Sequence, residues 1–331
     1  MPSPTLSDVH VNQPLTNVSV AFIQDATNFV ATNVFPNIPV PKQSDRYYTY
    51  DRGNFNRDEM QVRAPGTESA GGGYTVDNTP TYYCETYAYH RDIADPLRAN
   101  ADNPLNLDRE ATVFVTTKAL IRREKLWTSS FFTGSIWTND YVGVSTITSG
   151  PQFLKWSGAT ATPIQDIRTA KRTILQSTGF EPNKLVLGRQ VYDALLDAPS
   201  IIDRVKYGQT GGSANTPAVV NKAILANLFE VGELVVMNAI ENTAHEGAAN
   251  VHSFIGGNNA LLCYATPTPG LMTPTAGYTF SWTGYLGAGA DGNRIKMFRM
   301  EHLASDRVEI EMSFAPKLVS ADLGYFFGSA T

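Results

Sequence analysis

A glycine-rich hexapeptide is the motif in this sequence that comes nearest to a ligand-binding signature. Residues 287–292 read Gly-Ala-Gly-Ala-Asp-Gly, which satisfies the GxGxxG pattern of dinucleotide-binding loops. That chemistry needs a strand before the motif and a helix after it, because N–H groups at the helix N-terminus hold the pyrophosphate. The residues that follow, Arg294–Met300, have no helix cap and resemble a strand. We therefore interpret the motif as the tip of a glycine-rich hairpin, and a nucleotide-using α/β enzyme is kept as an alternative.

No other set of residues has the spacing of a catalytic or metal site. The five histidines form neither an HExxH motif nor another ligand spacing; they are His10, His90, His245, His252 and His302. The sequence contains no GxSxG nucleophile motif and no GxxxxGK[ST] phosphate loop. Cys84 and Cys263 make no CxxC pair, so we expect buried thiols. We predict no catalytic residue, no cofactor and no metal.

A charged and aromatic stretch, Ser44–Tyr74, has few aliphatic residues and nearly balanced acids and bases. Asp51–Gly53 and Gly71–Gly73 supply turns, so a long protruding hairpin is predicted, with a return strand over Tyr83–Tyr89. Arginine interleaved with tyrosine occurs at single-stranded nucleic-acid sites, but here the acids cancel the attraction for phosphate. Ion pairs between subunits are favoured. The candidate inter-subunit contacts are Arg46, Asp51, Arg52, Arg57, Asp58, Glu59, Arg63 and Glu68.

The longest predicted helix covers residues 103–133 and would be roughly 45 Å long at about 1.5 Å per residue. Asn103 is expected to cap it, with Pro104 in the first turn. Its apolar residues form two stripes, separated by a polar wedge of Glu110, Thr117 and Glu124. The stripes are Leu107, Phe114, Ile121 and Val113, Leu120, Trp127. A helix with two stripes can contact two different bodies, so we expect a spine that joins two units.

The remaining elements surround this spine. Before it, a polar arm contains a short helix within Val18–Val34 that ends at a proline series. After it, Gly143–Ser157 is expected to be a loop. Strands and helices then alternate as in an α/β domain; the helices are Pro163–Thr178, Gln190–Leu196, Ile201–Val205 and Thr216–Leu228, and the strands are Lys184–Leu187, Glu233–Ile240 and Ala260–Ala265. Arg307–Ser313 alternates as a half-buried strand.

Composition limits the function classes. The 331 residues are 42% hydrophobic, enough for one large or two modest domains. A net charge of −5 argues against a nucleic-acid binder held by a basic surface. The sequence shows no signal peptide and no apolar run of the length that a membrane span needs. Only 17% of residues are charged, so much of the surface is uncharged and we expect partners to cover it.

Together with the spine and the hairpin, two segments point to a known family. They are Glu181–Gly208 (EPNKLVLGRQVYDALLDAPSIIDRVKYG) and the ending ASDRVEIEMSFAPKLVSADLGYFFGSA. The chain resembles, over nearly its whole length, the major capsid proteins of tailed bacteriophages with shells of the Hong Kong 97 type. The resemblance implies an α+β capsid fold: an N-terminal arm (1–42), an extended β-hairpin loop with its return strand (43–92), a peripheral domain with the spine helix (93–162), an α/β axial domain (163–296), and C-terminal strands that complete the peripheral domain (297–331).

Two departures from the family pattern bear on assembly. In the type member a lysine of the extended loop joins covalently to a neighbouring asparagine, whereas this loop has arginines and no lysine beyond Lys42 at its edge. Arginine cannot act as that nucleophile, so no crosslink is predicted. The type member also carries a long scaffolding segment that is removed. This chain starts its arm almost at once, so we expect a separate scaffolding protein and no maturation cleavage.

The sequence therefore predicts a structural major capsid protein that self-assembles into an icosahedral head around double-stranded DNA. The expected partners are other copies as hexamers and pentamers, a scaffolding protein, a portal protein, optionally a decoration or cement protein, and packaged DNA without sequence specificity, with no membrane. The virion is the expected location, after assembly in the host cytoplasm. Arg122, Arg123 and Lys125 either pair with acids, which we favour, or face DNA. The alternatives are an encapsulin-like compartment shell, another virion component, and the nucleotide-using enzyme.

Overall fold

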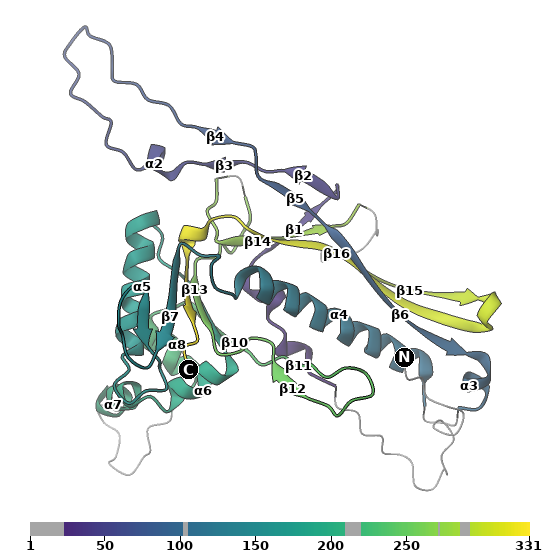
Figure 1. Cartoon of the computed structure of the whole chain (residues 1–331). Helices are drawn as coiled ribbons and strands as arrows, with labels where there is room; N and C mark the ends of the chain where they lie inside the picture. Colours follow the sequence, from purple (N-terminus) through teal and green to yellow (C-terminus); the bar gives the residue numbers. More distant parts are fainter. Residues whose placement is uncertain (1–22, 102–104, 209–219, 271, 285–291) are drawn as a thin grey trace.

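Two β-sheets joined by a long helix organise the chain (Figure 1). The computed structural model describes residues 23–101, 105–208, 220–270, 272–284 and 292–331. Within these ranges one sheet has five strands and the other has six. Helices accompany both sheets, which confirms the α+β class expected from the sequence.

The five-stranded sheet is built around β16 (Ser305–Leu318). On one edge of β16 lies β6 (Glu85–Ala94), in antiparallel register. On the other edge lie β14 (Gly277–Trp282) and then β15 (Asn293–Met300), end to end, and β1 (Asn37–Val40) pairs with β14 in parallel. The predicted alternation is confirmed, because Val308, Ile310 and Met312 are buried on one face of β16.

The strands that flank the glycine motif do not form a hairpin. Residues 287–291 lie outside the described part of the chain, but β14 and β15 both run antiparallel to β16 along the same edge. These strands are therefore collinear and do not pair with each other, so the predicted hairpin tip is wrong. A strand and not a helix follows Gly292, as predicted. The helix N-terminus that a pyrophosphate would need is thus not found at this position.

The six-stranded sheet has the order β10-β9-β13-β17-β7-β8. Its strands are β7 (Asn139–Val144), β8 (Gln152–Leu154), β9 (Lys184–Gly188), β10 (Glu233–Met237), β13 (Ala260–Cys263) and β17 (Gly324–Gly328). The accompanying helices are α5 (Pro163–Thr178), α6 (Arg189–Leu196), α7 (Pro199–Gly208) and α8 (Lys222–Phe229). Gly179 ends α5 with a φ of 79°, a conformation that glycine adopts without steric cost.

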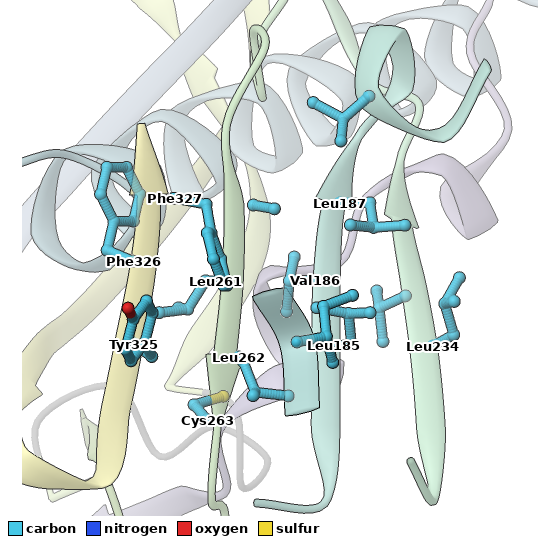
Figure 2. Packing of buried hydrophobic residues seen from close by; sticks show 14 of the residues in the cluster. Leu185, Val186, Leu187, Leu234, Leu261, Leu262, Cys263, Tyr325, Phe326 and Phe327 are labelled. Carbon is cyan, nitrogen blue, oxygen red and sulfur yellow. The ribbon is translucent and has the colours of Figure 1, made fainter. Parts of the chain in front are cut away.

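Central strands of this sheet carry continuous apolar runs because both faces are covered. Figure 2 shows their side chains in adjacent rows, from β17 through β13 and β9 to β10. Leu185, Val186 and Leu187 of β9 are all fully buried. Strands buried on both faces lose the apolar–polar alternation of a half-exposed sheet. The short buried strand predicted at Lys184–Leu187 is confirmed.

The spine is α4 (Leu107–Phe131), which lies along the five-stranded sheet and ends in the core of the six-stranded one (Figure 1). It starts later than predicted. Asn103 and Pro104 lie outside the described residues, and Asn106 is the cap, since its side chain accepts a hydrogen bond from the Arg109 N–H. The signal that sequence reasoning missed is Asn106, a second asparagine that can cap a helix and that lies closer to the apolar run.

The two predicted stripes of α4 are wrong. One stripe is buried, at a spacing of four residues: Leu107, Ala111, Val115, Ala119, Arg123, Trp127 and Phe131. The first four apolar members of this stripe pack on β6 and β16, whereas Trp127 and Phe131 belong to the core of the other sheet. The helix does join two bodies, but it contacts them one after the other along its length. Gly277 of β14 permits the close approach, since a Cβ there would lie 2.8 Å from the Phe131 ring.

The short elements modify several other predictions. In the arm, the described residues form η2 (Ala26–Asn28) and α1 (Ala31–Val34), separated by the extended residue Phe29, so a continuous helix is wrong there. The predicted loop Gly143–Ser157 contains the end of β7 and all of β8. The predicted strand Glu233–Ile240 stops at Met237, and β11 (Ile240–Asn242) then pairs with β12 (His252–Phe254). The remaining turns are α3 (Asp95–Ala99), η3 (Glu301–Leu303) and η4 (Ala321–Leu323).

The sheets do not follow the sequence boundaries expected for the domains. β7 and β8 precede residue 163 and β17 follows residue 297, yet all three lie in the six-stranded sheet. Conversely, β14 and β15 begin before residue 297 and lie in the five-stranded sheet. After β6 the chain crosses between the sheets three times: through α4, between β13 and β14, and between β16 and β17. The six-stranded sheet is thus built from segments that lie before, within and after residues 163–296.

Candidate inter-subunit surfaces

The hairpin at residues 44–83 is held only at its base. β2 (Ser44–Arg46) pairs with β5 (Thr81–Tyr83), and β3 (Thr49–Tyr50) pairs with β4 (Val76–Asp77). Beyond them, α2 (Arg52–Phe55) is capped by Asp51, whose carboxylate accepts from the Gly53 N–H at 2.9 Å. The predicted protruding hairpin is confirmed, and Figure 1 shows it extending away from both sheets.

An aromatic cluster closes the base of this loop. The rings of Tyr50, Phe55 and Tyr74 lie 5.5–6.3 Å apart. Beyond them the tip has only local hydrogen bonds, such as Arg63 Nε to the Thr67 carbonyl. Met60 and Val62 are 92% and 103% exposed. They are the most exposed large apolar side chains in the described part of the chain.

The eight candidate contact residues are not equivalent. Arg52 pairs within the chain, with Asp322 at 2.7 Å, and Asp51 caps α2. Arg46 lies in β2, and Arg63 donates to a local carbonyl. In contrast, no ion pair joins Arg57, Asp58, Glu59 or Glu68 to any other described residue of the chain. The tip thus carries charges of both signs without an internal partner, while its base is tied down.

A second surface forms where the arm meets the spine. The Glu124 carboxylate accepts hydrogen bonds from the Val30 and Ala31 N–H groups, at 3.0 and 2.9 Å. Further along the arm, Gln24 bonds both the N–H and the C=O of Ile240, and Lys184 Nζ donates to the Asn33 carbonyl. The Gln24 side chain thus attaches the arm to the start of β11, the Asn33 carbonyl attaches it to the start of β9, and Glu124 attaches it to α4.

Glu124 has the most unusual environment of the ionisable groups where the arm meets α4. Its side chain is fully buried, and Oε1 has no hydrogen-bond partner among the described residues. Burial raises the pKa of Glu124 from 4.5 to about 7, although the hydrogen bonds from Ala31 and Val30 oppose that rise. The position was predicted to be a polar wedge on the helix surface. Sequence periodicity did not reveal that the arm would cover it.

The face of the five-stranded sheet opposite α4 carries a ladder of ion pairs. Arg294 contacts Glu311 at 2.6 Å, Lys296 contacts Glu309 and Glu311 at 3.0 and 2.8 Å, and Arg307 contacts Asp92. Burial would raise the pKa of Glu311, but hydrogen bonds from Lys296 and Arg294 outweigh it and lower the pKa. The charges of this face are thus paired within the chain, unlike those of the loop tip, although the buried Arg294 Nε has no hydrogen-bond partner among the described residues.

The three bases near the end of α4 have different environments. Lys125 pairs with Glu241 at 2.6 Å, as favoured from the sequence. Arg123 is buried, with its guanidinium 4.9 Å from the Phe314 ring centre, and Arg122 is exposed beside Tyr87. Acid pairing is therefore confirmed for Lys125, while Arg122 and Arg123 each contact an aromatic ring.

Nothing in the described residues resembles a reaction centre. No group of three metal-binding side chains occurs there, and no helix in the same ranges is long and apolar enough to cross a membrane. Cys84 and Cys263 are both buried, as expected, and burial raises the pKa of their thiols to about 11 and about 12. These sulfurs are protonated at neutral pH and unreactive.

The chain is similar in sequence to major capsid proteins of phages. A family model for phage major capsid protein E matches residues 154–312. The chain is 24% identical over 334 residues to the major capsid protein of Burkholderia phage BcepMu, covering 97% of each. It is 26% identical over 322 residues to the major capsid protein of Pseudomonas phage JBD67, again covering 97% of each.

Solved structures agree at the level of the fold. A phage-related protein of Bordetella bronchiseptica RB50 matches with a TM-score of 0.68 and 20% identity, over 93% of both chains. The capsid of cyanophage P-SCSP1u matches at 0.62 and 13% identity, over 99% of this chain and 95% of the other. An encapsulin of Synechococcus elongatus matches at 0.56 and 11% identity, over 99% and 95%. The curated relatives of the present chain are major capsid proteins, which are structural shell proteins and not enzymes. These findings show the Hong Kong 97-type fold, and the relatives that match over nearly the whole chain are phage major capsid proteins.

Proposed function

We propose that this capsid protein assembles without covalent crosslinks into the icosahedral head that encloses phage double-stranded DNA. Copies associate as hexamers and pentamers, with the six-stranded sheet unit towards the capsomer axis and the five-stranded sheet unit at the periphery. The arm and the extended loop make the contacts between subunits. This assignment accounts for a loop that has no packing partner in its own chain.

The loop tip is the observation that carries the proposal. Met60 and Val62 are almost fully exposed, and the neighbouring Arg57, Asp58 and Glu59 have no ion pair within the described residues. Burying two such side chains against a neighbour contributes about 1.5–3 kcal/mol each. Charge pairs at the rim then select the orientation of the neighbour more than they add affinity. Repeated over every copy, modest contacts of this kind hold a closed shell.

The remaining partners follow from this role. A separate scaffolding protein guides assembly in the host cytoplasm, a portal protein occupies one vertex, and a decoration or cement protein is an optional addition. Packaged DNA lies against the inner face without sequence specificity. An acidic chain repels DNA on average, so the genome is not bound tightly over the whole surface.

The direct test is to express the chain with and without its neighbouring genes and to examine the products by electron microscopy and sedimentation. Closed polyhedral particles or capsomer rings are expected, and dependence on one neighbouring gene would identify the scaffold. A Met60→Ser/Val62→Ser variant should remain folded but lose particles. A wild-type chain that stays a small oligomer under every condition would contradict the proposal.

The encapsulin-like compartment is the second candidate, because the encapsulin fold match covers nearly the whole chain. The two functions differ in their contents. Nuclease-protected DNA of genome length inside particles from infected cells supports the phage head. Particles that instead enclose a co-purifying enzyme and no DNA would favour the compartment.

A further inference from the structure

A group of basic and aromatic side chains covers the junction between β6 and α4. The ring of Phe114 contacts two cations, Arg91 at 5.6 Å and Lys118 at 5.4 Å from its centre. One turn further along the helix, Arg122 lies 4.8 Å from the centre of the Tyr87 ring. Phe114 is 37% exposed, and Lys118 and Arg122 are exposed. We call Arg91, Lys118 and Arg122 the basic cluster.

The basic cluster has no acidic partner within the described chain. None of its three members forms an ion pair with another described residue. Among nearby carboxylates, Glu85 accepts a hydrogen bond from the Tyr87 hydroxyl. Glu110 lies eight residues before Lys118, about 12 Å along the helix, which exceeds the screening length of about 8 Å at physiological salt. The cluster therefore carries three positive charges against the single carboxylate of Glu85, on a chain of net charge −5 in which the nearby Lys125 is paired.

The aromatic contacts restrict what kind of anion fits here. A single-stranded nucleic acid would need free aromatic faces on which to stack its bases. The rings of Phe114 and Tyr87 are instead in contact with the cations themselves, while the charged ends project from a rigid helix and strand. Lys118 and Arg122 are one helical turn apart, so they present two charges on one line. This arrangement suits binding to phosphates at the surface of a duplex and provides no contact that would distinguish one base from another.

We propose that the basic cluster is a contact site for the phosphate backbone of double-stranded DNA, which makes the exposed side of α4 a face that lines the interior of the shell. This inference rests on the proposed function and adds to it a location for the DNA contact. Each neutralised phosphate contributes through release of bound counterions, so the contact is weak, independent of sequence and lost at high salt.

The test compares two matched variants of the full chain, prepared as unassembled subunits or capsomers. Lys118→Gln/Arg122→Gln removes two charges one turn apart on α4. Arg168→Gln/Arg172→Gln removes two exposed charges at the same spacing on α5 and serves as the control. Binding of a labelled 30-base-pair duplex of random sequence is followed by fluorescence anisotropy over a series of NaCl concentrations. Circular dichroism and electron microscopy of assembled particles establish that each variant folds and assembles.

The expected result is that the slope of log K against log salt falls in magnitude by about 2 in the α4 variant, at roughly 0.9 per phosphate contact. The α5 variant should keep the wild-type slope. Equal weakening in both variants, or an unchanged slope in the α4 variant, overturns the inference. Unchanged DNA binding with weaker binding of poly-glutamate would also overturn it, by assigning the cluster to an acidic protein segment. If the wild-type chain forms no particles, the proposed function fails. If it forms particles but the α4 variant keeps the wild-type salt slope, only the DNA contact is refuted.

Discussion

Replacing Glu124 by glutamine should remove the pH dependence of the attachment between the arm and the spine. In the wild type, the Glu124 carboxyl holds the Val30 and Ala31 N–H groups while its other oxygen is buried without a partner. Glutamine keeps an acceptor for those N–H groups but cannot ionise. Its NH₂ group takes the place of the unpartnered oxygen, so a constant cost of about 1–3 kcal/mol is expected at every pH.

The magnitude for the wild type follows from the pKa of Glu124, which is about 7 when the arm is attached and 4.5 when it is not. Between these values the attached state binds more protons than the detached state. The free energy of detachment therefore falls as the pH rises through this window, and it is constant below pH 4.5 and above pH 7. At roughly 1.4 kcal/mol per pH unit, the whole loss over this window is about 3–4 kcal/mol, or roughly 300-fold in the opening equilibrium.

Amide hydrogen exchange of Val30 and Ala31 measures this opening directly, once corrected for the intrinsic pH dependence of exchange. Protection in the wild type should fall by up to about 300-fold between pH 4.5 and pH 7, whereas Glu124→Gln should show a flat profile. Glu110→Gln, an exposed acid on the same helix, is the control and should match the wild type. Parallel pH profiles for wild type and Glu124→Gln would refute the reasoning, since the buried carboxyl would then not titrate on detachment.

Three further predictions concern the spine and the loop. Trp127→Ala should lower the free energy of unfolding by about 3–5 kcal/mol, measured by urea denaturation, because the side chain is buried at the end of α4 that enters the six-stranded sheet core. Ala111→Leu should cost about 1–3 kcal/mol by overpacking the contact between α4 and β16, and a gain in stability would contradict that contact. Arg52→Ala should change the unfolding free energy by no more than about 1 kcal/mol, because its pair with Asp322 is partly exposed. A larger loss in that denaturation experiment would show that α2 supports the rest of the chain.

Sequence reasoning succeeded where one residue type has one structural consequence. Pro163 and Gly179 mark the two ends of α5 because proline suits the first turn and glycine adopts the left-handed cap. Alternation in Arg307–Ser313 likewise predicted the buried apolar side chains Val308, Ile310 and Met312, although Glu311, expected to face outward, is buried as well. The protruding hairpin followed from the lack of aliphatic residues between Ser44 and Tyr74. In each case the signal is local, so no knowledge of distant contacts was needed.

It failed where a distant segment decides the outcome. Ala111 and Ala119 belong to the contact face of α4 because their small side chains let β16 approach closely. The predicted stripe instead contained the larger residues Phe114 and Ile121, which are not buried. Glu124 is buried because an arm residue more than ninety positions away covers it. The membership of β7, β8 and β17 in one sheet could not be inferred, since their pairing partners are separated by long stretches of chain. The exposed apolar tip at Met60 and Val62 also carries no periodic signal.

The three crossings of the chain between its sheets have a mechanical consequence. A force that separates the two units pulls at once on α4, on the segment between β13 and β14, and on the segment between β16 and β17. Three backbone segments that share a load in parallel must yield together, whereas a single linker would extend alone. The joint within each subunit therefore resists stretching more strongly than a hinge between consecutive domains. If the arm and loop make the contacts between subunits, as proposed above, strain in a filled shell is expected to be relieved first at those contacts.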